Sequence, residues 1–189
     1  MHLTLCDYLT DVVQNAVEAG ASRIVLEAVE DREGVELTVV DNGKGMDPEA
    51  LKRAFDPFYT EAGKHPGRRV GLGLPFLRQA VEQTGGTLRA DSKPGEGTAI
   101  RFRFPAAHAD TPPAGDWAGT LTGLMALPGE FELTVTRRCG AAGYAVARGE
   151  LAEALGGLDT ADTLALARQY LEGREDELKE AKGTASWRS

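Results

Sequence analysis

The sequence predicts an α/β protein, a two-layer sandwich in which helices cover one face of a mixed β-sheet. Apolar residues recur with helical period before residue 20 and again after residue 73. Four segments between residues 23 and 104 instead alternate apolar and polar side chains, as strands with one covered face do. Helices that pack on one side of such a sheet produce this two-layer architecture.

The first helix is expected to end near Gly20, a residue type that favours helix termination. Two strands follow, over residues 23–28 and 35–39, and residues 31–34 suit a hairpin turn between them. The apolar stripe of the first helix consists of Leu9, Val12, Val13, Ala16 and Val17.

A short helix is expected to begin at Asp47, an N-cap residue followed by Pro48 at the first helical position. Residues 60–70 are polar and indicate a loop, and a second long helix follows residues 71–74 and ends at Gly85. Two strands over 87–91 and 98–104 complete this part, with a turn at 93–97. The buried face of the second helix is expected to contain Phe76, Leu77, Ala80, Val81 and Thr84.

The chain is expected to divide into a domain over residues 1–107, a linker over 108–118 and a small α+β extension over 119–189. In the extension, strands are predicted at 120–127 and 131–138, with a third near 143–148, before a helix over 160–181. Leu164, Leu171 and Leu178 follow a heptad spacing, which favours a packing helix or a subunit contact over a coiled coil.

Composition narrows the classes of partner and compartment. The 189 residues include 21 Lys and Arg against 29 Asp and Glu, a net charge of −8, which argues against nucleic-acid or anionic-membrane partners. No apolar run approaches the roughly 18 residues of a membrane span, and the N-terminus lacks signal-peptide character, so a cytoplasmic location is expected. Cys6 and Cys139 are too far apart in sequence to indicate a zinc site or a disulfide framework.

Polar residues on the first helix form the first candidate site. Asp11 and Asn15 are four residues apart and share the face opposite the apolar stripe. Such a pair could hold a hard cation, and the carboxylate could act as a general base. The alternative is a solvated polar helix face.

Three glycine-containing segments add to that pair. Asp41 ends a strand, and Gly43 and Gly45 after it would let backbone approach a ligand closely; the alternative is a simple turn. The segment 71–74 precedes a helix and follows Lys64, Arg68 and Arg69, a combination that suits phosphate; the alternative is a turning loop. Directly after the turn at 93–97, Thr98 could offer a hydroxyl beside the sheet.

These segments, in this order, resemble the GHKL family of ATP-binding domains, which includes histidine kinases, gyrase, a heat-shock chaperone and MutL. Residues 11–16 (DVVQNA) resemble its N box, 41–46 (DNGKGM) its G1 box, 55–60 (FDPFYT) the F box of histidine kinases, 71–74 (GLGL) its G2 box and 95–98 (GEGT) its last glycine box. The resemblance covers about residues 5–105 and implies the Bergerat-type fold.

The resemblance implies roles for individual residues. Asn15 would bind Mg²⁺ that bridges the phosphates of ATP, and Asp41 would accept a hydrogen bond from the adenine amino group, with Thr98 beside it. Residues 60–70 would form a lid. The remaining positions implied to bind nucleotide are Gly43, Gly45, Met46, Lys64, Arg68, Gly71, Leu72, Gly73 and Leu74.

Departures from the family pattern leave the activity open. Asp11 stands where ATPase members usually have Glu, so a base is retained with a side chain shorter by one methylene. None of His2, His65 and His108 has the sequence context of a phosphoacceptor. The favoured hypothesis is a stand-alone histidine-kinase-like module that acts on a separate protein. A homodimer of this module is compatible with that hypothesis. The alternatives are an ATP-hydrolysing switch of MutL or chaperone type and a non-catalytic ATP sensor.

Overall fold

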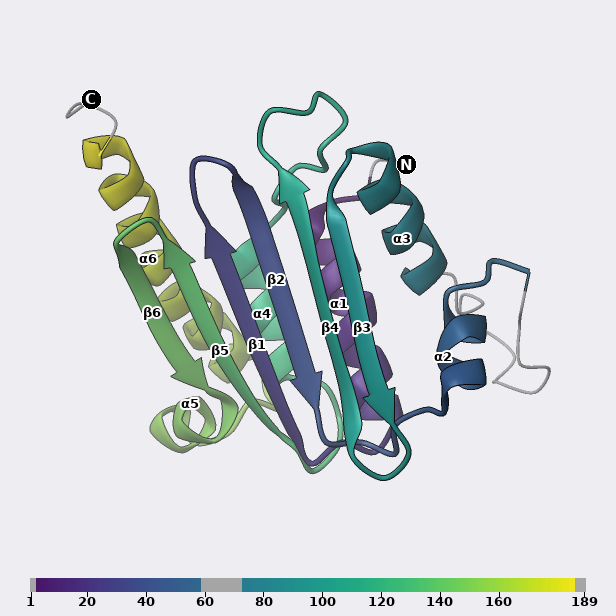
Figure 1. The fold of residues 1–189 in the computed structure, drawn as a ribbon. Helices are drawn as coiled ribbons and strands as arrows, with labels where there is room; N and C mark the ends of the chain where they lie inside the picture. The colour runs from purple at the N-terminus through teal and green to yellow at the C-terminus, as the bar shows by residue number, and fades with distance from the viewer. Residues whose placement is uncertain (1–2, 59–72, 186–189) are drawn as a thin grey trace.

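The structure is a computed structural model that describes residues 3–58 and 73–185, with side chains through residue 181. A mixed six-stranded sheet forms one layer and helices form the other (Figure 1). In chain order the elements are α1 (Leu5–Glu18), β1 (Arg23–Glu30), β2 (Gly34–Asp41), α2 (Pro48–Ala54), α3 (Gly73–Gln83), β3 (Thr87–Lys93), β4 (Gly97–Pro105), α4 (Trp117–Met125), β5 (Glu132–Cys139), β6 (Ala142–Ala147), α5 (Arg148–Leu155) and α6 (Ala161–Ala185).

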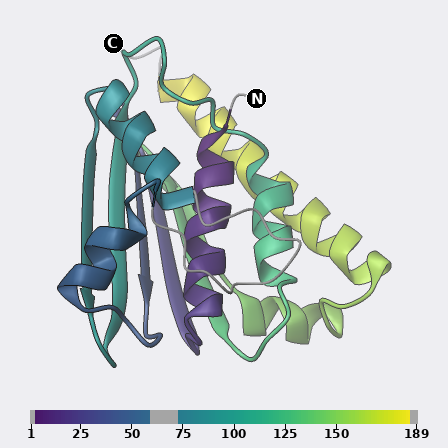
Figure 2. The same cartoon turned by 90° about the vertical axis from the view of Figure 1, so that its right-hand side faces the viewer.

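The sheet has the order β3-β4-β2-β1-β5-β6, and its strands are antiparallel except for the parallel pair of β1 and β5. Figure 2 shows the sheet nearly edge-on, with α1, α4 and α6 along one face. The core lies between these layers because most apolar side chains of the alternating strands point toward the helices, whereas Val40 of β2 is exposed. Fully buried examples are Leu9, Leu26, Leu37, Phe102 and Leu133.

The expected two-layer sandwich is therefore confirmed, and so are most of its elements. α1 is N-capped by Thr4, whose hydroxyl accepts from the Asp7 amide while the Asp7 carboxylate accepts from the Thr4 amide. The carboxylate of Asp47 accepts from the Ala50 amide and starts α2, with Pro48 at its first position. Residues 60–70, predicted as a loop, lie outside the described residues.

Two expectations about local structure are wrong. Residues 120–127 belong mainly to α4 rather than to a strand, because Asp116 caps a helix there and Trp117, Leu121, Leu124 and Met125 bury one side of it. A short apolar run does not distinguish a strand from a buried helix by period alone. Phe76, expected on the buried face of α3, is 42% exposed, whereas Leu77, Val81 and Thr84 of the same predicted face are buried as expected.

Residues 119–185 extend the first part of the fold instead of building a sheet of their own. β5 pairs with β1 along eight residues, from Arg23 opposite Glu132 to Glu30 opposite Cys139. α4 and α6 continue the helical layer, and buried side chains of both parts form one hydrophobic core. The boundaries at residues 107 and 119 stay predictions. In the part of the chain that the structure describes, none of the helices has both the length and the apolar character to cross a membrane.

Candidate nucleotide site

The polar side of α1 carries the first two candidate residues. Asp11 is half-buried and Asn15 is exposed, one helical turn further along. The opposite side of α1 packs against the sheet through Leu9, Val12, Val13 and Ala16. This packing fixes the direction in which Asp11 and Asn15 can point.

Asp41, the last residue of β2, is half-buried and held by its neighbours. Its Oδ1 accepts a hydrogen bond from the Gly43 amide at 2.8 Å. Burial raises the pKa of Asp41 because the ionised form loses hydration, while hydrogen bonds from the backbone of Gly43 and Thr98 oppose this shift. Thr98 stands opposite Asp41 in the β2–β4 pair, so a carboxylate and a hydroxyl are held side by side.

The loops after β2 and between β3 and β4 contact each other backbone to backbone. A Cβ added to Gly45, whose φ is +62°, would lie 2.0 Å from the Lys93 carbonyl oxygen. A Cβ on Gly97, whose φ is +100°, would lie 2.0 Å from the Asp41 carbonyl oxygen. These glycines are thus required by contact between two protein loops, a reason that the sequence analysis did not give.

Ser92 connects the same two loops and was missed by the sequence analysis. Its hydroxyl oxygen accepts from the Met46 amide at 2.8 Å and lies 3.0 Å from the Gly97 carbonyl oxygen and 2.8 Å from Thr98 Oγ1. Ser92 and Thr98 are opposite each other across the turn at 93–97. Two hydroxyl residues at mirrored positions around a predicted turn were the signal that could have revealed this pair.

The loop after β2 is also attached to the end of α1. The Lys44 amide donates to the Ala19 carbonyl at 2.9 Å, and a Cβ on Gly43 would lie 2.9 Å from that oxygen and from the Ala19 Cβ. The Asn42 side chain accepts from the Ser22 and Arg23 amides, so it holds the loop in place.

The second contact of α1 is with α3. A Cβ on Gly73 would lie 2.5 Å from Asp11 Oδ2, so the two helices meet where Gly73 has no side chain. Leu74, the next residue, is buried in the core. Lys64, Arg68, Gly71 and Leu72, together with the expected lid over 60–70, lie outside the described residues.

The described candidates therefore lie along α1, which joins two groups. Asp11 meets Gly73 at one point, and Ala19 meets the loop that carries Asp41, Gly43, Gly45 and Met46 at the other. Ala19 is eight residues after Asp11, a distance of about 12 Å at the helical rise per residue. Asn15 stands midway between the two groups.

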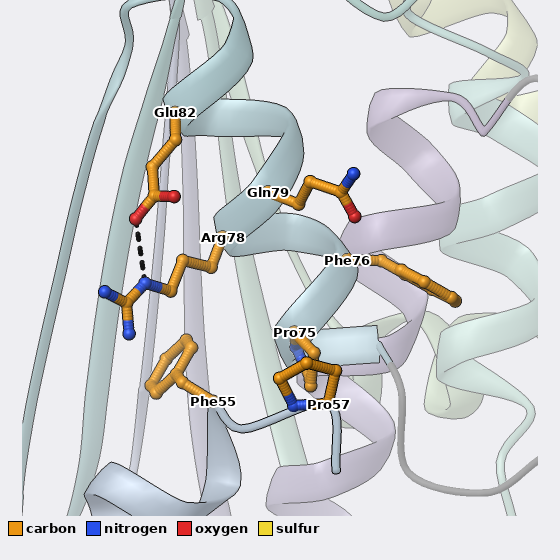
Figure 3. A pocket seen from close by; sticks show the side chains of 7 residues that line it. All are labelled: Phe55, Pro57, Pro75, Phe76, Arg78, Gln79 and Glu82. Atoms are coloured by element: carbon orange, nitrogen blue, oxygen red, sulfur yellow. Dashed lines mark hydrogen bonds and ion pairs between the residues drawn. The ribbon is translucent and has the colours of Figure 1, made fainter.

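A hollow of about 310 Å³ lies elsewhere, between the end of α2 and α3 (Figure 3). Phe55, Pro57, Pro75 and Phe76 form its apolar part, and the ion pair of Arg78 and Glu82 lies beside them. It includes none of the polar candidates described above. The candidate site is therefore the pair of groups that α1 joins, and not this hollow.

Comparison with known proteins agrees with the order of these segments. The model of the histidine kinase-, DNA gyrase B- and HSP90-like ATPases matches residues 2–108, more than half of the chain, and the chain belongs to that family. The sensor histidine kinase YxdK of Bacillus subtilis is 39% identical over 97 residues, 49% of this chain and 30% of that kinase. The sensor histidine kinase ZraS of Klebsiella oxytoca is 39% identical over 100 residues, 51% of this chain and 21% of that kinase.

Solved structures extend the comparison. A mycobacterial sensor histidine kinase, MprB, is 29% identical, with a TM-score of 0.41 over 52% of this chain and 69% of its own. The N-terminal domain of a DNA repair protein is 14% identical, with a TM-score of 0.50 over 76% of this chain and 51% of its own. The likeness to the DNA repair protein concerns the fold alone, and it extends beyond the residues that the family model matches. The chain spans less than a third of the length of the two curated kinases.

Proposed function

We propose that the chain binds Mg-ATP, with adenine at Asp41 and the phosphates near Asn15 and Asp11. The observation that carries this proposal is the half-buried Asp41 carboxylate beside Thr98, anchored by the Gly43 amide. An ionised carboxylate accepts hydrogen bonds without donating any, which suits the exocyclic amino group of adenine. The Thr98 hydroxyl, which can donate or accept, suits the neighbouring ring nitrogen or a bridging water.

The polar face of α1 fits Mg²⁺ that arrives with the phosphates. Among the described residues, no cluster of three or more His, Cys, Asp or Glu side chains could hold a metal ion. Mg²⁺ commonly takes one or two protein oxygens and completes its shell with substrate phosphates and water. The Asn15 carboxamide would supply one such oxygen, and the ion would neutralise charge on the phosphates.

We further propose that the module transfers phosphate to a separate protein, as a histidine-kinase-like enzyme of signalling in the cytoplasm. Family membership and the sensor histidine kinases among the relatives support this reading. His108 is in the segment between β4 and α4, where its Nδ1 accepts from the Asp110 amide, and its context does not favour an acceptor role. A homodimer is part of this proposal.

ATP hydrolysis is the second candidate function, and Asp11 favours it. Its carboxylate is half-buried beside Gly73, on the same face of α1 as Asn15. A carboxylate in that position could orient or deprotonate a water molecule next to bound phosphate. A switch of this kind would hydrolyse ATP slowly and label no protein.

Calorimetry of Asp41→Asn tests the binding proposal. The Asn side chain would place an N–H donor opposite the exocyclic amino group of adenine, which is also a donor. ATP affinity should therefore fall at least about tenfold. The matched control is Asp91→Asn, the same change on an exposed residue of β3, which should bind like the wild type. Equal affinity of wild type and Asp41→Asn would refute the adenine site.

Labelled ATP separates the two activities. Purified chain is incubated with γ-labelled Mg-ATP, alone and with cell extract, and both free phosphate and labelled protein are measured. Transfer to a separate protein supports the kinase, whereas free phosphate that disappears in Asp11→Asn supports the hydrolytic switch. Binding with neither product identifies a non-catalytic ATP sensor.

A further inference from the structure

The face of the sheet opposite α1, α4 and α6 carries an uneven distribution of charge. It is turned toward the reader in Figure 1, where those helices lie behind the strands. At one edge, β6 has the sequence AGYAVA and contains no charged residue. Near the other edge, the charges that β3 and β4 place on this face are mostly positive: Arg89, Lys93, Arg101 and Arg103 against Asp91. This corner is positive in a chain whose net charge is −8.

Three of these residues, Arg89, Arg101 and Arg103, form what we call the arginine patch. Arg89 and Arg101 are directly opposite each other in the antiparallel β3–β4 pair, so their Cβ atoms are about 5 Å apart. Like charges in that arrangement destabilise a sheet. Arg103, two residues after Arg101, points to the same face. Its Nη2 donates to both carboxylate oxygens of Asp31, at 2.9 and 3.2 Å, so its charge is compensated.

The charges of Arg101 and Arg89 are compensated much less. Arg101 Nε donates to the neutral hydroxyl of Thr38 and lies 3.9 Å from a carboxylate oxygen of Glu36, and its side chain is 58% exposed. Arg89 is exposed, and within the described part of the chain its side chain forms neither a hydrogen bond nor an ion pair. The free chain thus holds two guanidinium groups side by side without carboxylates to match them.

A row of apolar residues lies beside the arginine patch. Ala99, two residues before Arg101, is opposite Val40 of β2, and Val40 is opposite Val25 of β1. Val40 is 42% exposed although it is in the middle of the sheet. Since residues two apart on a strand share a face, this row and the patch form one surface.

We propose that the arginine patch and the apolar row bind an acidic segment of a partner protein, with carboxylates on the arginines and an apolar side chain on Val40. The guanidinium group pairs with a carboxylate through two parallel hydrogen bonds, a geometry that suits Arg89 and Arg101. Such binding would also remove the repulsion between these two residues. The inference does not depend on nucleotide binding, because α1 and its polar residues lie on the other face of the sheet.

The surroundings of the patch favour a short acidic protein segment over a nucleic acid or a lipid surface. Asp91 and Glu36 border the patch on the same face, and both would repel a long polyanion that ran past it. The net charge of −8 acts in the same direction. The apolar row suits the side chain of a protein segment, whereas a sugar-phosphate backbone has no apolar group to place there.

An NMR titration of the isotope-labelled full chain with the blocked peptide EELEEL, up to about 1 mM, tests the proposal. The peptide should bind saturably and shift the amide signals of Arg89, Arg101 and Val40. The double variant Arg89→Gln/Arg101→Gln should bind at least about fivefold more weakly. The matched control, Arg23→Gln/Arg138→Gln, removes the same charge from exposed positions of β1 and β5 and should bind like the wild type.

Three results of this titration would overturn the proposal: no binding to the wild type, an equal loss in the two double variants, or equally tight binding of the neutral peptide QQLQQL. A short oligothymidylate and vesicles of phosphatidylglycerol are tested in parallel. Tighter binding of either one through Arg89 and Arg101 would also overturn it, because the surface would then be a site for nucleic acid or lipid.

Urea unfolding measures the uncompensated charge of Arg89 without any ligand. Arg89→Gln should raise the unfolding midpoint at about 20 mM salt because it relieves the repulsion from Arg101, and the gain should shrink at about 500 mM salt. Arg23→Gln changes the net charge equally and should show no such gain. A lower midpoint for Arg89→Gln at low salt would contradict the proposal, since Arg89 would then stabilise the free chain.

Discussion

Gly73 of α3 lies directly against Asp11 of α1: a Cβ at position 73 would be 2.5 Å from Asp11 Oδ2 and 2.7 Å from the Asp11 Cβ. The Cβ of Asp11 is fixed by the backbone, so no rotamer of Asp11 would relieve that overlap. The spacing of α1 and α3 at the candidate phosphate site therefore depends on a residue without a side chain.

Gly73→Ala should force α1 and α3 apart and lower the free energy of unfolding by about 1–3 kcal/mol, as overpacking does. Gly123→Ala is the matched control, because a Cβ there, on the exposed side of α4, would meet no atom within 4 Å. The control should gain up to about 1 kcal/mol from helix propensity. Urea unfolding measures both changes, and two similar values would contradict the close contact.

Ser92→Ala should leave the Met46 amide without its acceptor and separate the loops that hold Asp41 and Thr98. The expected loss is about 1–2 kcal/mol of stability, and ATP affinity should fall with it. Ser22→Ala removes an exposed hydroxyl that accepts from the Asn42 side chain, and it should change either quantity much less. Urea unfolding and calorimetry, run on both variants, test the role of Ser92; equal effects would reject it.

The ionised carboxylate of Asp41 should lower the free energy of unfolding near neutral pH. Its pKa is raised from 3.8 by burial, so the native state keeps the proton to higher pH than the unfolded chain does. The cost is absent below the ordinary pKa and reaches its full size once the pH exceeds the raised one. Relative to the wild type, Asp41→Asn should therefore gain stability between about pH 3 and about pH 7, as measured by urea unfolding.

Asp31→Asn is the control for Asp41→Asn, because the pKa of Asp31 is shifted in the opposite direction. The hydrogen bond from Arg103 lowers the pKa of Asp31 below 3.8, so ionised Asp31 stabilises the native state above that pH and the contribution is lost as pH falls. Asp31→Asn should thus lose stability relative to the wild type as pH rises over the same range. Parallel pH trends for the two variants would contradict the assignment.

The buried ion pair of Arg137 and Glu175 should be costly to break. Arg137 Nε and Nη2 each donate to Glu175 at 3.1 Å, and the guanidinium carbon lies 3.9 Å from the Trp117 ring centroid. Glu175→Gln removes the buried carboxylate and leaves Arg137 only the partly exposed Glu30 carboxylate, 3.8 Å away, so stability should fall by up to about 3–5 kcal/mol. Thermal or urea unfolding measures this loss.

Glu172→Gln is the control for Glu175→Gln, since Glu172 also pairs with an arginine of α6, Arg168, but on the exposed surface. Exposed pairs are screened by water, so little change is expected. A loss for Glu172→Gln as large as that for Glu175→Gln would show that burial is not the deciding factor.

Much of the fold was predictable because its signals are local. The apolar stripe of Leu9, Val12 and Val13 and the N-cap Asp47 depend on residues within one or two turns of each other, and both predictions are confirmed. The apolar run at 120–127 was predicted wrongly as a strand because its helical start depends on Asp116, which had been assigned to the linker.

The candidate site likewise contains residues that a local sequence pattern identifies and a contact that it does not. Asp41, Gly45 and Thr98 are recognisable in sequence because each lies in a short segment that resembles a box of the family. The pairing of Ser92 with Thr98 had a local signal, two hydroxyl residues at mirrored positions around the turn, but the contact of Ser92 with the Met46 amide, 46 residues away, has none.

By itself the sequence predicted the family and most helices and strands between residues 5 and 105, since period, capping and turn chemistry are properties of neighbouring residues, and it suggested the residues of the proposed nucleotide site. The tertiary structure decided that β5 runs parallel to β1, so that residues 119–185 extend the same sheet and core. It also decided which edge of that sheet lacks charges. These features depend on backbone pairing between segments about one hundred residues apart, and nothing in either segment alone specifies its partner.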